Sequence, residues 1–443
     1  MMLITMVVAL LKRVQELEAR LGENSTNSSR PPSTDSPYTR SKDRAEKKST
    51  DKGKRRQGGQ VGHNGQGPKL LPPTETNDIH PQRCSCGCTQ FMDLGVFYTH
   101  QEAELPDIAM LIRHFLLHKG QCKRCGKVSR ATIPTGHQTG YGPKLSALIA
   151  LLSGDHGDSR LTVQRFCTQF LGLEISTGAI QKVLNRVSKA IKPHYDAIEK
   201  FVHSQEVNHV DETPWYQKHA VLQWLWVLCN NKAAFFRIYA NRNKKAFKAL
   251  IGKWEGILVS DNYGVYTKWV DLHQTCLAHL IRKAKKLADH KDQGIAKFGT
   301  WACNELRLLV SMANAPPTKG EWAAFYARLC RLIAKNKDRK DQAGTYARTL
   351  EKLIGNLWIF LEVEGVDATN NLAERMLRAA VIWRKRSFGT ESETGDRWVE
   401  RILTLIQTCR LQKKLSYPVL VDAIDAYLFV KDPDINWIKN LGS

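Results

Sequence analysis

The sequence predicts an α+β multidomain chain, in which a sheet-based domain is preceded by small modules and interrupted by helices. Three observations favour this fold class. Three β-rich segments follow one another at 206–242, a long helical stretch separates them from a further charged helix, and two cysteine clusters stand nearer the N-terminus. A chain of 443 residues is long enough for several folded units.

Residues 1–24 predict a leucine-zipper-like, coiled-coil helix. Its apolar residues recur at heptad spacing: Leu3, Val7, Leu10, Val14, Leu17 and Leu21. Self-association through this seam and a simple amphipathic cap both fit the pattern. Residues 25–77 are rich in Ser, Pro, Gly, Lys and Arg and poor in apolar residues, which is typical of a basic flexible linker.

Residues 78–135 predict a small zinc-binding module. Two thiol clusters separated by a long loop suit a tetrahedral zinc site, because each pair can sit on a tight turn that glycine permits. The predicted ligands are Cys84, Cys86, Cys122 and Cys125, with Cys88 as an alternative ligand. His80 and His100 are possible substitutes. Unligated thiols are the other interpretation of these clusters.

Residues 136–200 predict a helical, helix-turn-helix-like DNA-binding domain. Helices are expected over 143–154, 161–172 and 176–191, with Gly172 ending the second and Ser176 or Thr177 capping the third. The third helix would offer polar side chains to DNA: Gln181, Lys182, Asn185 and Arg186. An ordinary helical hairpin has the same pattern, so both interpretations stay open.

Residues 201–283 predict the first part of a catalytic domain. Strands are expected over 206–217, 220–230 and 233–242, then a helix, then a fourth strand over 256–266. We expect Asp211 at the end of the first of these strands and Asp261 at the end of the fourth. If those strands are neighbours, the two carboxylates lie side by side. Their repulsion would then be relieved by divalent metal ions between them.

Residues 363–412 predict the second part of this domain and supply a third acid. Glu374 lies in a helix that Thr369 or Asn370 can cap. Two acids on strands and one on a helix form the ligand set of a two-metal phosphoryl-transfer site. Basic residues flank Glu374 where DNA phosphates would lie: Arg375, Arg378, Arg384, Lys385 and Arg386. Residues 284–362 read as an all-α insertion, and 413–443 as a C-terminal tail.

The chain resembles the insertion sequence 66 family of bacterial transposases over nearly its whole length. The motifs that carry the resemblance are NSTNSSRPPSTD after the zipper, GGQVGHNGQG at 58–67, the paired cysteines, DETPW at 211–215, SDNYGVY at 260–266, CLAHLIRKAKKL at 276–287, TNNLAERMLR at 369–378 and RKRSFGTESETGDRWVERILTLIQTCRL at 384–411.

This resemblance implies an RNase H-like catalytic domain of the DDE type. Asp211, Asp261 and Glu374 would be its catalytic triad and would bind two Mg²⁺ (or Mn²⁺) ions per active site. The implied activity is strand cleavage and strand transfer at the element's inverted repeats. The family pattern includes a Cys-x-x-His pair, and Cys276, His279 and Asn371 are possible supporting residues around the metal ligands.

The formal net charge of +23 favours a polyanionic partner, since neutralising phosphates releases counterions. The expected partners are double-stranded DNA, a second copy of the chain on DNA, and accessory proteins of the same element. The longest clean apolar run, at 1–11, is far shorter than the ~20 residues that span a bilayer, so no membrane partner is expected. We expect a bacterial cytoplasmic, nucleoid-associated protein with reduced thiols.

Two other functions remain as alternatives. A non-catalytic DNA-binding regulator would use the zipper, the zinc module and the helix-turn-helix, but it would leave the three acids unexplained. An RNase H-like structure-selective nuclease would use the acids. It would not need a long N-terminal region to bind DNA ends, and it would nick DNA without joining it.

Overall fold

The computed structural model describes residues 70–218, 221–266 and 272–442. The predicted zipper helix and most of the predicted linker lie outside these residues. The chain divides into two units, Ser36–Leu111 and the remainder, and the described residues 70–111 of the smaller unit contain no helix or strand. Among the helices that the structure describes, none is both long and apolar enough to cross a membrane.

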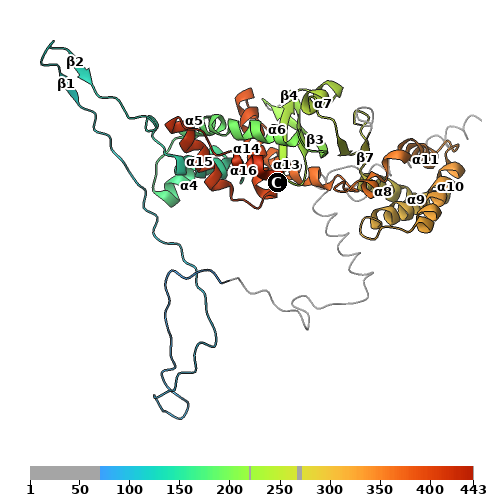
Figure 1. Ribbon diagram of the computed structural model, residues 1–443, viewed down its shortest axis with the longest axis horizontal. Coiled ribbons are helices and arrows are strands. Elements are labelled where there is room, and N and C mark those ends of the chain that lie inside the picture. The colour runs from blue at the N-terminus through green and yellow to red at the C-terminus, as the bar shows by residue number, and fades with distance from the viewer. Residues whose placement is uncertain (1–69, 219–220, 267–271, 443) are drawn as a thin grey trace, which may run out of the picture. The chain divides into compact units, whose positions relative to one another are not determined.

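A five-stranded mixed sheet lies at the centre of the larger unit (Figure 1). Its strands are β3 (Val207–Gln217), β4 (Val221–Cys229), β5 (Ala234–Tyr239), β6 (Ile257–Ser260) and β7 (His273–Thr275), in the order β5-β4-β3-β6-β7. The first three pair antiparallel as a meander, and β6 and β7 add in parallel. The predicted mixed α/β architecture is confirmed, and β7 is a strand that the sequence did not predict.

The pairing of β3 with β6 is the feature of this sheet that matters most for the site. The two strands run parallel, with His209 opposite Val259. Helix α7 (Lys244–Ile251) provides the crossover between β5 and β6, begun by the side chain of Asn243, which accepts a hydrogen bond from the amide of Ala246. The first and fourth predicted strands are therefore neighbours.

The edge strand β5 is covered by helix α14 (Glu393–Leu411). Alternate amide groups of the strand donate hydrogen bonds to one stripe of the helix: Ile238 to Glu400 Oε1 (2.7 Å), Phe236 to Thr404 Oγ1 (3.0 Å) and Ala234 to Thr408 Oγ1 (3.2 Å). The acceptors are spaced by four residues, so they share one helix face. They satisfy donors that a bare sheet edge would leave open.

The N-terminal helical region contains α3 (Pro143–Gly154), α4 (Arg160–Leu171), α5 (Thr177–Ala190) and α6 (Lys192–Val202). The three predicted helices are confirmed within a residue or two. Gly172 ends α4 in the left-handed conformation, and the Ser176 hydroxyl caps α5 by accepting from the amide of Ala179. Helices α15 (Ser416–Phe429) and α16 (Asn436–Lys439), in the stretch predicted as a tail, pack against α3, α5 and α6.

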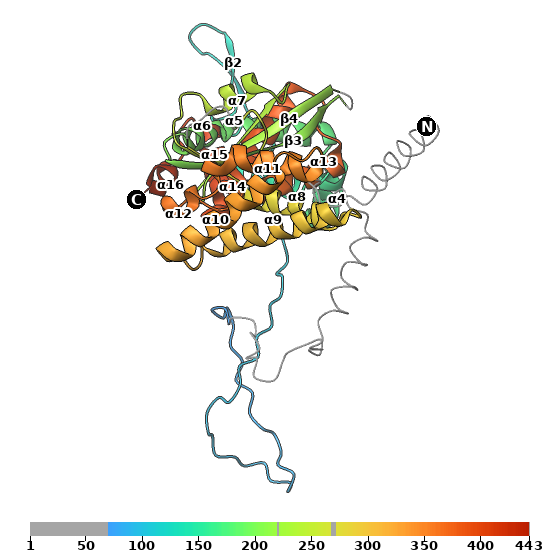
Figure 2. The ribbon, with the colours of Figure 1, turned by 90° about the vertical axis from the view of Figure 1, so that its right-hand side faces the viewer.

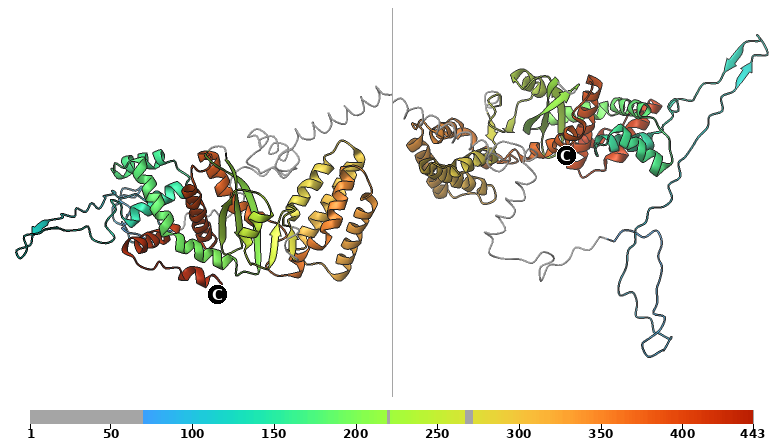
Figure 3. Two further views of the ribbon diagram at one scale, coloured as in Figure 1. Left: turned by 90° about the horizontal axis from the view of Figure 1, so that it is seen from above. Right: turned by 180° about the vertical axis from the view of Figure 1, so that it is seen from behind.

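The predicted insertion is helical throughout and has its own apolar core. It consists of α8 (Leu277–Ala288), α9 (Gln293–Ser311), α10 (Lys319–Asn336), α11 (Gln342–Leu353) and the short α12 (Ile359–Glu362). Figure 2 shows these helices in front of the sheet, and Figure 3 shows the sheet between them and the N-terminal helices. The chain then returns to the sheet through α13 (Asn371–Ser387), which packs on β3 and β4.

We predict that Thr404→Val destabilises the protein by about 1–3 kcal/mol, because the buried amide of Phe236 loses its acceptor while the side-chain volume is kept. Urea unfolding followed by tryptophan fluorescence measures the change. Thr300→Val, at an exposed position of α9, is the control and should change the unfolding midpoint little. Equal effects of the two substitutions would show that the hydrogen bond to β5 contributes no stability.

Candidate active site

Three acids converge where β3, β6 and α13 meet. Asp211 lies two residues beyond His209 on β3, and Asp261 lies two residues beyond Val259, directly after β6. Continuing the parallel register therefore brings Asp211 level with Asp261. Glu374 lies in the first turn of α13. Asp211 thus lies in the middle of β3, not at the strand end that the sequence predicted, whereas Asp261 directly follows β6 and Glu374 lies at the start of α13.

The electrostatics of the acids show that they interact. Burial raises the pKa of Asp211 well above its usual range, and the neighbouring charges of Glu212, Asp261 and Glu374 raise it further. Burial also raises the pKa of Asp261, with a smaller contribution from Glu374. Nevertheless, no three His, Cys, Asp or Glu side chains in the described ranges already stand in positions that would hold a metal ion.

Helix α8 holds the Glu374 carboxylate. The Arg282 guanidinium forms an ion pair with Glu374 Oε1 (3.2 Å), and His279 Nε2 lies 3.7 Å from the same oxygen. Burial, together with the charges of Arg282 and Lys283, lowers the pKa of His279 to about 3, so the imidazole is neutral near pH 7. His279 and Arg282 are one turn apart on α8 and share a helix face.

Asn370 joins the start of α13 to β3 and to the start of α8. Its side-chain amide nitrogen donates to Val210 O (2.8 Å), and its Oδ1 lies 3.1 Å from His209 Nδ1. Both polar atoms of the side chain are therefore bonded to β3. Its backbone amide donates to Cys276 Sγ (3.1 Å), which also lies 3.3 Å from His279 Nδ1. Asn370 is the N-cap residue of α13 and is one of the two that the sequence predicted. Its side chain bonds to β3, however, and makes no capping hydrogen bond to the helix.

Glu212 is a fourth acid close to the three predicted ones, although it faces the other side of the sheet, and no pattern in the sequence singled it out. Its carboxylate is bonded to the guanidinium of Arg242 and to the hydroxyl of Tyr266. Burial raises its pKa to about 7, opposed by Arg242 and reinforced by Asp261. The Arg242 guanidinium lies 4.1 Å from the ring centroid of Tyr263. Alternation along β3 could have shown that Glu212 faces the opposite side of the sheet from Asp211.

The basic residues of α13 fall into two groups. Arg375, Arg378, Lys385 and Arg386 are exposed. Arg384 is half-buried and donates to Thr213 Oγ1 (3.0 Å) and to Pro214 O, so its guanidinium joins α13 to β3.

The predicted DNA-facing residues of α5 are mostly engaged within the protein. Gln181 accepts from Arg160 and donates to Asn185 Oδ1 (2.8 Å), and Arg186 is half-buried. Lys182 is exposed. Asn371, predicted as a supporting residue, is also exposed at the start of α13.

The predicted zinc ligands are all exposed, unbridged thiols. Cys122 and Cys125 lie in the turn of a hairpin formed by β1 (Lys119–Gln121) and β2 (Val128–Arg130), where the Gly126 amide donates to Cys122 O (2.8 Å). The other cluster turns through Gly87, whose amide donates to Cys84 O (2.8 Å). Hydrogen bonds from Cys86 and from Cys125 lower the pKa of Cys84 and of Cys122, respectively, which favours the thiolate.

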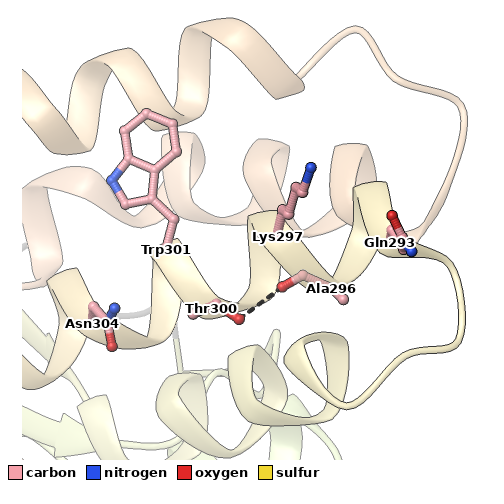
Figure 4. Close-up of a pocket in the computed structure, with 6 residues that line it drawn as sticks. All are labelled: Gln293, Ala296, Lys297, Thr300, Trp301 and Asn304. Atoms are coloured by element: carbon pink, nitrogen blue, oxygen red, sulfur yellow. Dashed lines mark hydrogen bonds between the residues drawn. The ribbon is translucent and has the colours of Figure 1, made fainter.

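One cavity of the insertion lies apart from these residues. It has a volume of about 470 Å³ and is lined by one face of α9, from Gln293 to Asn304 (Figure 4). Lys297 and Trp301 are the only basic and the only aromatic side chain in its lining. None of the predicted site residues contributes to this cavity.

Comparison with known proteins identifies the family. Residues 140–397, more than half of the chain, match the family described as Transposase IS66 family. The chain belongs to the IS66 transposase family. This match contains β3, β6 and α13, and hence all three acids. Residues 2–69 match a separate family of unknown function, DUF6444.

Two proteins of Sinorhizobium fredii are similar to this transposase. The uncharacterized protein y4hP is 25% identical over 383 residues, which cover 75% of this chain and 68% of y4hP. The uncharacterized protein y4qI is 25% identical over 221 residues, covering 42% of this chain and 40% of y4qI. The longer alignment shows that similarity extends through much of the transposase chain.

We predict that Asn370→Ala lowers the free energy of unfolding by about 1–3 kcal/mol, because Val210 O and His209 lose a buried hydrogen-bond partner. Chemical denaturation measures the loss. Asn371→Ala provides a matched control, since that neighbouring side chain is exposed. If Asn371→Ala destabilises the protein as much as Asn370→Ala, the bonds to β3 do not account for the effect.

Proposed function

We propose that this member of the IS66 family is an active DNA transposase, which cuts and joins strands at the ends of its own element with Asp211, Asp261 and Glu374 as metal-binding catalytic residues. The observation that carries the proposal is the convergence of the three acids where β3, β6 and α13 meet, and the charges of Asp261 and Glu374 add to the effect of burial on the pKa of Asp211. Carboxylates gathered from two strands and a helix, in a half-buried place, are stabilised by bound cations.

The donor set fits Mg²⁺ or Mn²⁺, because all three groups offer hard carboxylate oxygens and no thiolate competes among them. Two divalent ions held there would supply Lewis acidity to the attacking and leaving oxygens of the phosphodiester. The protein's own contribution is to orient the acids. Arg282 and neutral His279 hold one oxygen of Glu374, while the Glu212 amide donates to Asp211 Oδ1 (2.9 Å) and the Tyr263 amide donates to Asp261 Oδ1 (2.9 Å).

DNA contacts are proposed chiefly for the exposed basic face of α13. Arg375 follows the third acid directly, and Arg378, Lys385 and Arg386 continue away from it. Lys182 on α5 is the exposed member of the predicted helix-turn-helix set. Joining two element ends requires both to be held at once. We therefore expect at least a dimer on DNA, together with accessory proteins of the element.

Glu374→Gln tests the catalytic assignment. The substitution keeps size and hydrogen bonding but removes the charge that binds a cation, so transposition of a marked element in cells should fall by about 100-fold or more. Binding to element ends, measured by gel shift, should persist. Glu364→Gln, at an exposed position before α13, is the matched control and should transpose normally.

Two outcomes for Glu374→Gln would contradict the expectation in different ways. Normal transposition by Glu374→Gln would show that the third acid is wrongly assigned. Loss of end binding together with activity would show that the substitution disturbs the protein more widely than the metal site.

A structural zinc ion is proposed for the cysteine clusters, supported by the paired turns and the lowered pKa values of Cys84 and Cys122. The purified full chain should contain about one zinc ion, measured by elemental analysis. Cys122→Ser with Cys125→Ser should remove it, whereas Cys330→Ser, in α10, should not. A metal-free native chain, or zinc retained by the double variant, would contradict the proposal.

A further inference from the structure

A second cavity opens between α13, α14 and the loop that follows α3. Its volume is about 280 Å³, and none of the three proposed metal ligands lines it. Four arginines do: Arg375, Arg378, Arg386 and Arg410. The first two follow Glu374 on α13, so one helix carries both the third proposed metal ligand and part of this cavity's lining.

The charge of this arginine pocket is only partly neutralised. Arg386 forms an ion pair with Asp158 (3.2 Å), and Arg410 forms one with Asp155, so the loop after α3 holds these two guanidinium groups in place. Arg375 and Arg378 are exposed and make no hydrogen bond or ion pair with any residue that the structure describes. The pocket therefore carries positive charge that is available to an anion.

Part of the lining of the arginine pocket is apolar. Ile382 is 53% exposed although it is large and aliphatic, and the half-buried Trp383 lies beside it. Leu403 and Ile406 of α14 also contribute to the lining, although their side chains are almost fully buried. A duplex backbone needs only the arginines, because its bases stay stacked within the helix. A concave apolar wall beside the cations fits a base that has left the stack, with its phosphate on the arginines.

We propose that the arginine pocket binds one unpaired nucleotide of the DNA strand that is processed at the acids. Arg375 and Arg378 contact its phosphate, and Ile382 and Trp383 contact its base. This inference rests on the proposed function, since it assumes that DNA is the substrate. It adds that DNA next to the reacting bond is held in an unpaired form.

The test compares two fluorescent duplexes of one sequence, bound by the full-length protein and followed by anisotropy. One duplex is fully paired and the other carries a short bulge of unpaired thymines. The native protein should bind the bulged duplex at least about 5-fold more tightly. Ile382→Asp should remove most of this preference. Arg378→Gln also removes a proposed contact to paired DNA, so it should weaken binding of both duplexes, and binding of the bulged duplex more than that of the paired one.

Two matched controls lie on the exposed face of α9. Arg307→Gln removes the same charge as Arg378→Gln, and Leu308→Asp introduces the same charge as Ile382→Asp at a side chain that is 41% exposed. Both controls should keep the preference for the bulged duplex. Circular dichroism of each variant excludes misfolding as the cause of a loss.

Three outcomes would overturn the inference. Equal affinity of the native protein for both duplexes would show that no unpaired nucleotide is recognised, while leaving the transposase proposal intact. Equal losses on both duplexes in the pocket variants would make the arginines ordinary backbone contacts. No binding to either duplex would contradict the proposed action on DNA as well, so failures of the two proposals are distinguishable.

Discussion

The parallel pairing of β3 with β6 holds two carboxylates close together although their negative charges repel each other. His209 opposite Val259 brings Asp211 level with Asp261, and burial then raises the pKa of both carboxylates. Backbone pairing imposes this arrangement because the residues directly before each acid are buried in the sheet, Asn208 to Val210 on β3 and Ile257 to Ser260 on β6. The repulsion between these two carboxylates is thus offset by the pairing and burial of the two strands.

Helix α13 must then be held against the same sheet, and Asn370 does this at the start of the helix. The side chain of an N-cap asparagine usually bonds to its own helix. Here it bonds to Val210 and His209 of β3, and the amide of Asn370 bonds to Cys276 at the start of α8. Tertiary contacts therefore position the start of α13, and they also position Glu374, which lies in its first turn.

Much of this architecture follows from local sequence patterns. Alternation and β-branched content predicted β3, β4 and β5, and capping residues such as Ser176 and Gly172 marked the helix ends. The acids were predicted from their places on those elements. The sequence did not reveal β7, because three residues are too few to show a period. Nor did it reveal the α14 contacts with β5, which join residues that are far apart in the chain.

The arginines of α13 illustrate the same limit in a single helix. By composition, Arg375, Arg378, Arg384 and Arg386 are equivalent candidates for phosphate contacts, but the structure gives them different surroundings. Arg384 bonds to Thr213 and the backbone of Pro214, and thereby fixes the rotation of α13 on β3. That rotation leaves Arg375 and Arg378 facing outward, without a protein partner in the described ranges. Because Arg384 bonds within the protein, Arg375 and Arg378 are the arginines of this helix that remain available for the proposed contacts with DNA.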